Sequence, residues 1–396
     1  MVMMALKGTV VLDLSRGFPG ARCAVFLADF GAEVIRIDPP TAAISTLTLT
    51  GIDATESEKL AAFSASNRNK KSIKLNLRSE QGREVFYRLV KKADVLIEGF
   101  RPGIMKRLQS DYETLKKQNP KLIYCALTGF GQDGPYANLP GHDMNYAAIG
   151  GALSLIGPLD GPPYLASNIL ADVAGAGLNG TIGILLALMA RERTGKGQFV
   201  DISYLDGVIS LLDEAGNYFA TGKVPRRGET FLTGGALYAN VYRCKDGEYI
   251  TIGCFEPNFW QNLCRAIGRE DLIPLQDPPP QKREMVKSAL QEAFLAKTRD
   301  EWFEFFKDKD TCLAPVYYLN ETFNDPQVRH RHMVAEIEDA HLGTVRQVGI
   351  PIKLSDTPGQ IKSLGVIAGA NTKEILLELG YTRDEIDKLQ QAQAVE

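Results

Sequence analysis

Short apolar runs alternate with amphipathic segments through the first two hundred residues of the chain. The runs VVLDLS, VIRID, SIKLNL and DVLIEGF have the length of strands, and several segments between them have helical spacing. One of these, SEQGREVFYRLVKKA, is a predicted helix with Ser79 at its N-cap and basic residues in its last turn. This alternation predicts an α/β fold with a mainly parallel sheet covered by helices on both faces.

The pattern changes after about residue 212. Residues 213–233 show loose periodicity and are predicted to form a linker, and a second unit begins at about Gly234. There, GGALYANVYRCKDGEYITIGC predicts two antiparallel strands joined at Lys245-Asp246-Gly247. Helical stretches follow, and NTKEILLELGYTRDEIDKLQQA is a predicted final helix. Residues 39–66 carry little periodicity and are predicted to cross the surface.

Composition and charge exclude several classes of protein. The 45 basic and 48 acidic residues give a net charge of −3, without the basic excess expected of a protein that binds nucleic acid or anionic membrane. The six cysteines form no CxxC pair, and the N-terminal residues have no signal-peptide pattern, which together predict a cytoplasmic or other reducing location. Residues 173–190 carry no charge, but their four glycines favour a close-packed core helix over a membrane span.

The first strand, helix and strand look like the start of a dinucleotide-binding domain, with Asp38 where an acid would hold a ribose hydroxyl. The phosphate loop does not fit, because only Gly17 and Gly20 stand where G-x-G-x-x-G is required. The basic segment NRNKK, residues 67–71, is predicted to be a solvated face. Arg101 and Arg107 follow the DVLIEGF strand, at the end of a parallel sheet where ligands collect.

One segment, residues 141–190, places a histidine and an acid on either side of a glycine-rich stretch. His142 precedes the apolar sequence MNYAAIGGALSLIG, whereas the other three histidines lie in a polar stretch between residues 330 and 341. Asp172 interrupts the apolar run NILADVAGAGLNGTIGILLALMA, where a carboxylate needs a hydrogen bond, a partner or a catalytic role. Two interpretations stay open: His142 and Asp172 are catalytic, or Asp172 is only a helix N-cap.

A series of motifs carries a resemblance that covers most of the chain, from about residue 7 through the predicted hairpin. In order, the motifs are VVLDLSRGFPG, VIRID, NRNKKSIKLNL, VLIEGFRPGIMKRL, NPKLIYCALTGFGQDGPY, GHDMNY and NILAD. Their order and approximate spacing resemble the family III CoA-transferase superfamily. The series is specific, although no single motif is.

Within that superfamily the chain is most similar to the α-methylacyl-CoA racemase branch. The resemblance implies that Asp172 is an acid/base in a racemase, or a nucleophile that forms an aspartyl-CoA intermediate in a transferase. His142, in GHDMNY, matches the racemases, as do Asn168, four residues before Asp172, and Glu256 in FEPNF. The predicted catalytic residues are therefore His142, Asp172, Glu256 and Asn168.

The resemblance also implies a fold and an assembly. A large CoA-binding α/β domain would comprise residues 1–212 and 335–396, and a small α+β domain residues 234–334. Two chains would thread through one another as an interlocked homodimer, so that Glu256 reaches His142 of the other subunit.

The expected substrate carries coenzyme A, and no separate cofactor is required. Arg107 matches an arginine of the family that binds CoA phosphate, whereas Pro39 stands where the family often has an arginine for the nucleotide end. Arg36 or the NRNKK segment could replace that contact. The predicted CoA-binding residues are Arg107, Arg101, Arg36, Phe100, Gly99, Lys71 and Tyr146.

The expected reaction is racemisation of 2-methyl-branched acyl-CoA thioesters by proton transfer at the α-carbon, through an enolate. Backbone N–H groups at the start of the Asp172 helix are the predicted enolate donors, and no metal-binding motif is present. Two alternatives stay open: a CoA-transferase that uses Asp172 as nucleophile, and a non-catalytic CoA-binding protein.

Overall fold

The computed structural model describes residues 3–40 and 60–396 and divides into two compact units. Unit 1 contains residues 1–150, 167–211 and 326–396, and unit 2 contains residues 151–166 and 212–325. Unit 2 thus includes residues 151–166, which we had assigned to the large domain, and the segment predicted as a linker. Most of the predicted surface excursion, residues 41–59, lies outside the described residues.

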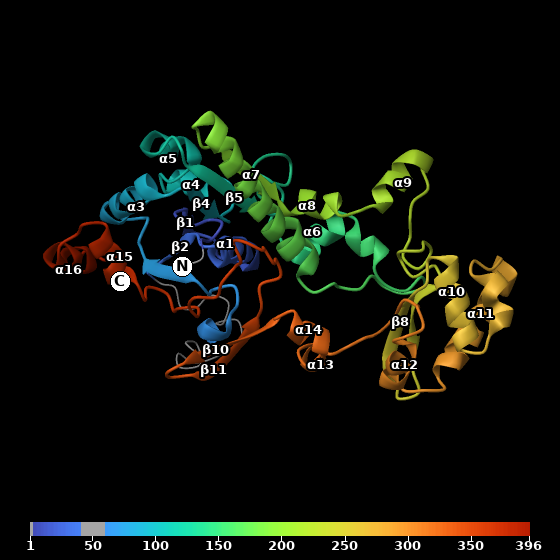
Figure 1. Cartoon of the computed structure of the whole chain (residues 1–396). Helices are drawn as coiled ribbons and strands as arrows, with labels where there is room; N and C mark the ends of the chain where they lie inside the picture. Colours follow the sequence, from blue (N-terminus) through green and yellow to red (C-terminus); the bar gives the residue numbers. More distant parts are fainter. Residues whose placement is uncertain (1–2, 41–59) are drawn as a thin grey trace. The chain divides into compact units, whose positions relative to one another are not determined.

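Unit 1 is built on a six-stranded sheet in which every pairing is parallel (Figure 1), as the alternation of strands and helices predicted. The strand order is β3-β2-β1-β4-β5-β6, so the chain reverses direction across the sheet between β1 and β4. The strands are β1 (Val10–Asp13), β2 (Glu33–Asp38), β3 (Lys70–Lys74), β4 (Val95–Glu98), β5 (Ile123–Thr128) and β6 (Phe199–Ser203). In sheets of this order, ligands bind beyond the carboxyl ends of the strands, at the reversal point.

Helices cover both faces of the sheet because neighbouring strand residues point to opposite sides. Val11 packs with residues of α1 and α7, whereas Leu12 packs with residues of α3, α5, α15 and α16. The helices of unit 1 are α1 (Phe18–Asp29), α3 (Glu80–Lys92), α4 (Ile104–Arg107), α5 (Tyr112–Gln118), α6 (Asp143–Ile149), α7 (Asn179–Thr194), α8 (Tyr204–Ser210), α14 (Pro326–His330), α15 (Thr372–Glu378) and α16 (Arg383–Gln391). An antiparallel pair, β10 (Val334–Asp339) and β11 (Gly343–Val348), completes the unit.

The predicted final helix is two helices, α15 and α16, rather than one. Gly380 has φ +89°, a left-handed conformation that glycine adopts without strain and that ends a helix. Thr382 then starts α16, since its hydroxyl accepts the N–H of Glu385 and the Glu385 carboxylate accepts the N–H of Thr382. The prediction was wrong because a glycine inside a helical pattern does not by itself decide between a weakened helix and a break.

The uncharged segment around Asp172 forms a π-helix, η3 (Ile169–Leu178), that continues into α7. Residues 169–194 together are long and apolar enough to cross a membrane by length and composition. One face of α7, however, buries Ile184 and Ala187 against α1 and the sheet. The other face leaves Ile182, Leu186 and Met189 at least half exposed.

Unit 2 has its own core, formed where helices pack on a small antiparallel sheet. Its elements are η2 (Ala152–Leu155), α9 (Glu214–Thr221), β7 (Ala239–Arg243), β8 (Tyr249–Gly253), α10 (Pro257–Ala266), η4 (Glu270–Leu275), α11 (Pro280–Phe294), α12 (Arg299–Phe306), β9 (Leu313–Pro315) and α13 (Leu319–Thr322). Strands β7 and β8 form the predicted hairpin, and Trp260, Phe294 and Trp302 are buried together above it. The predicted linker contains helix α9.

The NRNKK segment is not the solvated face that the sequence predicted. The Lys70 side chain is fully buried and its Nζ lies 3.0 Å from Oδ2 of Asp13, at the end of β1. Arg68 makes two hydrogen bonds to Asp29 at the end of α1, of 2.7 and 2.9 Å, and also donates to the backbone oxygen of Val348. These buried contacts join β3, β1, α1 and β11.

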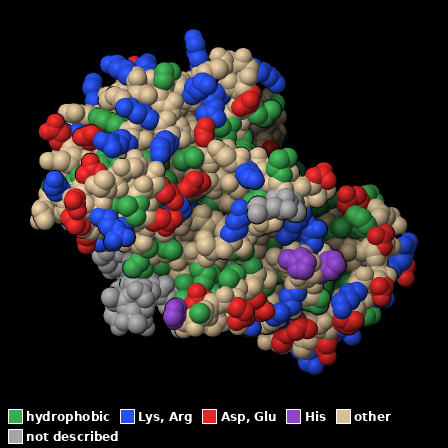
Figure 2. Space-filling model, turned by 60° about the vertical axis from the view of Figure 1, so that its left-hand side comes forward, with side chains coloured by type: hydrophobic (Ala, Val, Ile, Leu, Met, Phe, Trp, Pro, Cys, Tyr) green, Lys and Arg blue, Asp and Glu red, His purple; other side chains and the backbone are tan. Residues whose placement is uncertain are grey.

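On the face of the molecule shown in Figure 2, basic and acidic side chains are interspersed. Within the NRNKK segment, Arg68 and Lys70 serve the interior of unit 1, whereas Lys71 is partly exposed.

We predict that Lys70→Met destabilises the protein by about 3–5 kcal/mol, because it leaves the buried Asp13 carboxylate without its cation. Lys71→Ala is the matched control: Lys71 is partly exposed and pairs with the exposed side chains of Glu374 and Glu378, so its loss should cost about 0–1 kcal/mol. Urea unfolding followed by circular dichroism measures both, and equal costs would contradict the structural role of Lys70.

Candidate active site

His142 and Asp172 belong to two elements of unit 1 that a single carboxylate joins. His142 is exposed and precedes α6, and its N–H donates to Oδ1 of Asn145 at 3.0 Å. The next residue, Asp143, is buried, and its Oδ2 accepts the N–H groups of Ala171 and Asp172 at 2.8 and 2.9 Å. Asp143 therefore fixes the start of α6 against the π-helix that carries Asp172.

The Asp172 carboxyl group has a perturbed acidity. Burial, and secondarily the nearby Asp143 carboxylate, raise its pKa from 3.8 to about 6, while the neighbouring His142 and a hydrogen bond from Asn168 act in the opposite direction. Three of the predicted catalytic residues, His142, Asp172 and Asn168, are thus brought together. A carboxyl group with a pKa near 6 can gain and lose a proton at neutral pH, as an acid/base catalyst must.

Asp172 is not the N-cap that the alternative interpretation required. It lies in the first turn of η3, four residues after Asn168, which occupies the cap position. Two N–H groups in the first turn of this helix, those of Ala171 and Asp172, donate to Asp143 and so are not the free enolate donors that we had predicted. The role of Asp143 was not predicted from the sequence, although this residue directly follows His142 in GHDMNY.

Small residues allow the wide π-helix to pack closely beside α8. A Cβ on Gly207 would lie only 2.1 Å from the backbone oxygen of Gly175, so this position in α8 accepts no side chain without movement of the backbone. Tyr204, which precedes Gly207 in α8, stacks edge-on against Tyr146 with ring centroids 5.2 Å apart. The charge of Asp172 adds to the effect of burial in raising the pKa of both tyrosines, which keeps their hydroxyls protonated beside the carboxyl group.

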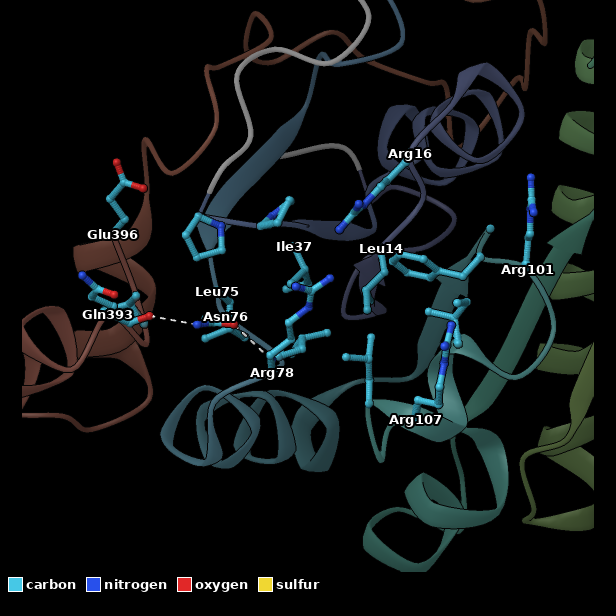
Figure 3. Close-up of a pocket in the computed structure, with 18 of the residues that line it drawn as sticks. Leu14, Arg16, Ile37, Leu75, Asn76, Arg78, Arg101, Arg107, Gln393 and Glu396 are labelled. Carbon is cyan, nitrogen blue, oxygen red and sulfur yellow. Dashed lines mark hydrogen bonds between the residues drawn. The ribbon is translucent and has the colours of Figure 1, made fainter. Parts of the chain in front are cut away.

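A cavity of about 1270 Å³ opens beyond the carboxyl ends of β1 to β4, at the point where the strand order reverses (Figure 3). Four predicted CoA-binding residues line it: Gly99, Phe100, Arg101 and Arg107. Two further arginines line the cavity and were not predicted from the sequence. These are Arg16, which follows β1, and Arg78, which precedes α3.

The other predicted CoA-binding residues lie outside this cavity lining. Arg36 pairs with Asp38 at 2.7 Å and donates to the backbone oxygen of Val366. Lys71 pairs with three acidic residues, Glu33, Glu374 and Glu378. Tyr146 is buried near Asp172, in contact with the rings of Phe130 and Tyr204.

Glu256, the fourth predicted catalytic residue, belongs to unit 2. It is exposed and occupies the N-cap position of α10, shortly after the end of β8, without a side-chain capping hydrogen bond. Among residues 3–40 and 60–396, no group of three or more His, Cys, Asp or Glu side chains could hold a metal ion.

The model of CoA-transferase family III matches residues 6–365 of the chain. The chain belongs to this family. It is 36% identical to the α-methylacyl-CoA racemase of Homo sapiens over 99% of its own length and 98% of that protein. It is 33% identical to the succinyl-CoA–L-malate CoA-transferase beta subunit of Chloroflexus aurantiacus, with 99% and 98% covered. The chain is therefore similar to both racemases and transferases of the family.

Solved structures support the fold. A CaiB/BaiF family protein from Brucella suis has a TM-score of 0.81 and 30% sequence identity, and the match covers 95% of this chain and 99% of that one. The α/β fold with its parallel sheet is thus confirmed, and the protein is an enzyme of the family III CoA-transferase and racemase superfamily.

The raised pKa of Asp172 predicts a pH-dependent stability. Between pH 3.8 and about 6 the folded carboxyl group holds a proton that the unfolded chain releases, so ionisation destabilises the fold as pH rises through this range. Asp172→Asn stays neutral and should be more stable than the wild type above pH 6, with an advantage that shrinks toward pH 4. Urea midpoints measured across this range test the prediction, and a constant difference would contradict it.

Proposed function

We propose that the protein is a racemase of 2-methyl-branched acyl-CoA thioesters. The observation that carries the proposal is the pairing of His142 with an Asp172 whose pKa is about 6. The GHDMNY motif and the 36% identity to α-methylacyl-CoA racemases of human and mouse support it.

Inversion at the α-carbon needs a base on one face of that carbon and an acid on the other. The proton there is too weakly acidic for a free histidine to remove, so the site must also stabilise the enolate. Neutral His142 removes the proton from one epimer and leaves an enolate, and protonated Asp172 returns a proton to the opposite face. The reverse direction exchanges the two roles. One C–H bond breaks and one forms, so the product differs from the substrate only in configuration.

Asp143 and Asn168 position the pair in this proposal. Asp143 holds the start of η3 against α6 through two backbone N–H groups, which fixes Asp172 relative to His142. Asn168 stabilises the ionised form of Asp172 through a side-chain hydrogen bond. Neither has to exchange a proton with the substrate.

A CoA-transferase is the second candidate, because the same Asp172 could attack a thioester as nucleophile. The chain is 33% and 32% identical to two CoA-transferases of the family, which supports this second candidate. The two reactions differ in their requirements: a racemase exchanges the α-hydrogen with solvent in the absence of a second substrate, whereas a transferase needs an acceptor acid.

We predict that the wild type incorporates deuterium at the α-carbon of a 2-methylacyl-CoA in heavy water without an acceptor acid, and that His142→Ala lowers this rate by about 10²- to 10⁴-fold. His341→Ala, at an exposed turn between β10 and β11, is the matched control and should exchange at the wild-type rate. Proton NMR of the α-methyl signal measures the exchange. CoA transfer to an acceptor acid without α-exchange would establish the transferase instead.

The active form is, in our proposal, an interlocked homodimer in which Glu256 of the partner subunit orients the His142 imidazole and stabilises its charged form. The exposed apolar face of α7 supports an oligomer, because Ile182, Leu186 and Met189 are 52%, 61% and 59% exposed. Apolar patches of this kind on a soluble protein commonly mark interaction sites. The exposure of Glu256 leaves its carboxylate accessible to another chain.

Co-expression of a His142→Ala chain with a Glu256→Ala chain tests this arrangement. In the mixed dimer, one site combines an intact His142 with an intact Glu256 from the other subunit, so activity should recover to about half of the wild-type value. Isolation of the tagged heterodimer and the exchange assay measure it. An inactive but folded heterodimer would reject the shared site and leave the His142 and Asp172 chemistry standing.

A further inference from the structure

Glu98, the last residue of β4, is a buried carboxyl group that the proposed reaction does not use. Strand β4 lies inside the sheet, between β1 and β5. Glu98 is only 4% exposed and faces the helices α3 and α5, because Leu96, two residues earlier, packs on that side. The buried acids Asp13 and Asp29 each have a cation partner. In the described parts of the chain, residues 3–40 and 60–396, Glu98 forms no ion pair.

Two neutral donors hold the Glu98 carboxylate instead of a cation. The N–H of Phe100 donates to its Oε2 at 2.7 Å, and the hydroxyl of Tyr124, on β5, donates a second hydrogen bond. Tyr124 is itself fixed, since its ring stacks on Phe199 with centroids 5.5 Å apart. The carboxylate therefore ties the segment after β4 to the neighbouring strand.

The segment that Glu98 ties down carries part of the cavity lining. Phe100 and Arg101 line the cavity, and the Phe100 ring supports the Arg16 guanidinium, 5.0 Å from its centroid. The segment then leads into α4, which carries Arg107 (Figure 3). Glu98 is not among the lining residues, so it acts on a ligand only through this segment.

The surroundings of Glu98 make its ionisation sensitive to pH near neutrality. Burial raises the pKa of Glu98 from 4.5 to about 7, against the two hydrogen bonds, and the charge of Asp201 on β6 adds to the rise. The other titratable groups that interact with this carboxyl group are Tyr124 and Cys125 on β5 and Tyr204 on α8. Burial raises the pKa of all three, so they stay neutral at pH 7 while Glu98 titrates.

Protonation of Glu98 weakens its hold on the segment. A hydrogen bond to an ionised acceptor is about twice as strong as one to a neutral acceptor. In addition, one of the two carboxyl oxygens becomes a donor, so the Tyr124 hydroxyl has to turn and accept. The N–H of Phe100 is therefore held firmly by the carboxylate and less firmly by the protonated acid.

We propose that Glu98 is a positioning residue that couples the binding of the acyl-CoA thioester to its own ionisation, with the carboxylate form holding Phe100 and Arg101 in the conformation that binds the ligand. The inference rests on the proposed function, which supplies the thioester as substrate. His142 and Asp172 carry out the chemistry once the thioester is bound. Glu98 therefore acts on the KM of the thioester and leaves kcat unchanged.

Calorimetric titration with a 2-methylacyl-CoA at pH 6 and pH 8 tests this coupling. Glu98→Gln keeps the shape of the side chain and an acceptor for Phe100 but stays neutral. This variant should bind the thioester about 10-fold more weakly than the wild type at pH 8, where the wild-type group is mostly ionised. The difference should fall to about twofold at pH 6, where the wild-type group is mostly protonated.

The ratio of the two Kd values at each pH isolates Glu98 from other groups that titrate in this range. The CoA phosphates, His142 and Asp172 are present with both proteins and cancel in the ratio. Glu113→Gln, at an exposed position on α5, is the matched control and should bind as the wild type does at both pH values.

Tyr124→Phe separates titration of Glu98 from a purely structural effect. The change removes one donor to the carboxylate and keeps the ring against Phe199. Because this hydrogen bond lowers the pKa of Glu98, the pH at which binding weakens should move upward, and an unmoved midpoint would contradict the proposal.

A ratio of Kd values that is equal at pH 6 and pH 8 would overturn the coupling. So would a Glu98→Gln variant with normal binding and a lowered kcat in the deuterium-exchange assay. A protein that binds with this pH dependence but exchanges no α-hydrogen loses only the racemase. A protein that exchanges normally with a constant ratio loses only the role of Glu98.

Discussion

The unit 1 sheet depends on two buried ion pairs that join Lys70, the first residue of edge strand β3, and Arg68, which precedes it, to the first βαβ segment. Asp13 and Asp29 stand at the ends of β1 and α1, where burial without a cation would be costly. Lys70 and Arg68, more than thirty-five residues later, supply those cations. Because these contacts set the position of β3 beside β2, they also place Leu75 to Arg78, which follow β3, in the wall of the cavity.

The presence or absence of a fixed carboxylate partner distinguishes structural cations from cations that can bind a ligand. Cations at the sheet whose carboxylate partners are fixed in the fold, such as Lys70 and Arg36, have no capacity left for a ligand. Arg107 and Arg16 line an open cavity instead and remain accessible from solvent. The pairing of each cation, rather than its presence in a basic stretch, thus decides whether it can serve an anionic substrate.

The fold followed from the sequence because strand length, helical spacing and the turn at Gly247 are local signals. His142, Asp172 and Asn168 could be selected from a motif resemblance, and the structure brings them together through Asp143. Contacts across long sequence separations were not predictable: no local pattern links Lys70 to Asp13, and none shows that Arg16 and Arg78 line the same cavity. The break at Gly380 was missed because glycine is tolerated within helices at a modest cost.

The bridge between Leu75 and Val395 has a consequence for biosynthesis. Leu75, in the cavity wall after β3, pairs with a residue more than three hundred positions later in the chain. Arg68 likewise donates to the backbone oxygen of Val348, which is synthesised much later. A chain emerging from the ribosome can therefore complete unit 2, whose residues 212–325 are contiguous, before unit 1 has all its partners. During that interval the residues after β3 lack their partner at Val395 and Arg68 lacks its acceptor at Val348, so this edge of the sheet is less protected than in the finished fold.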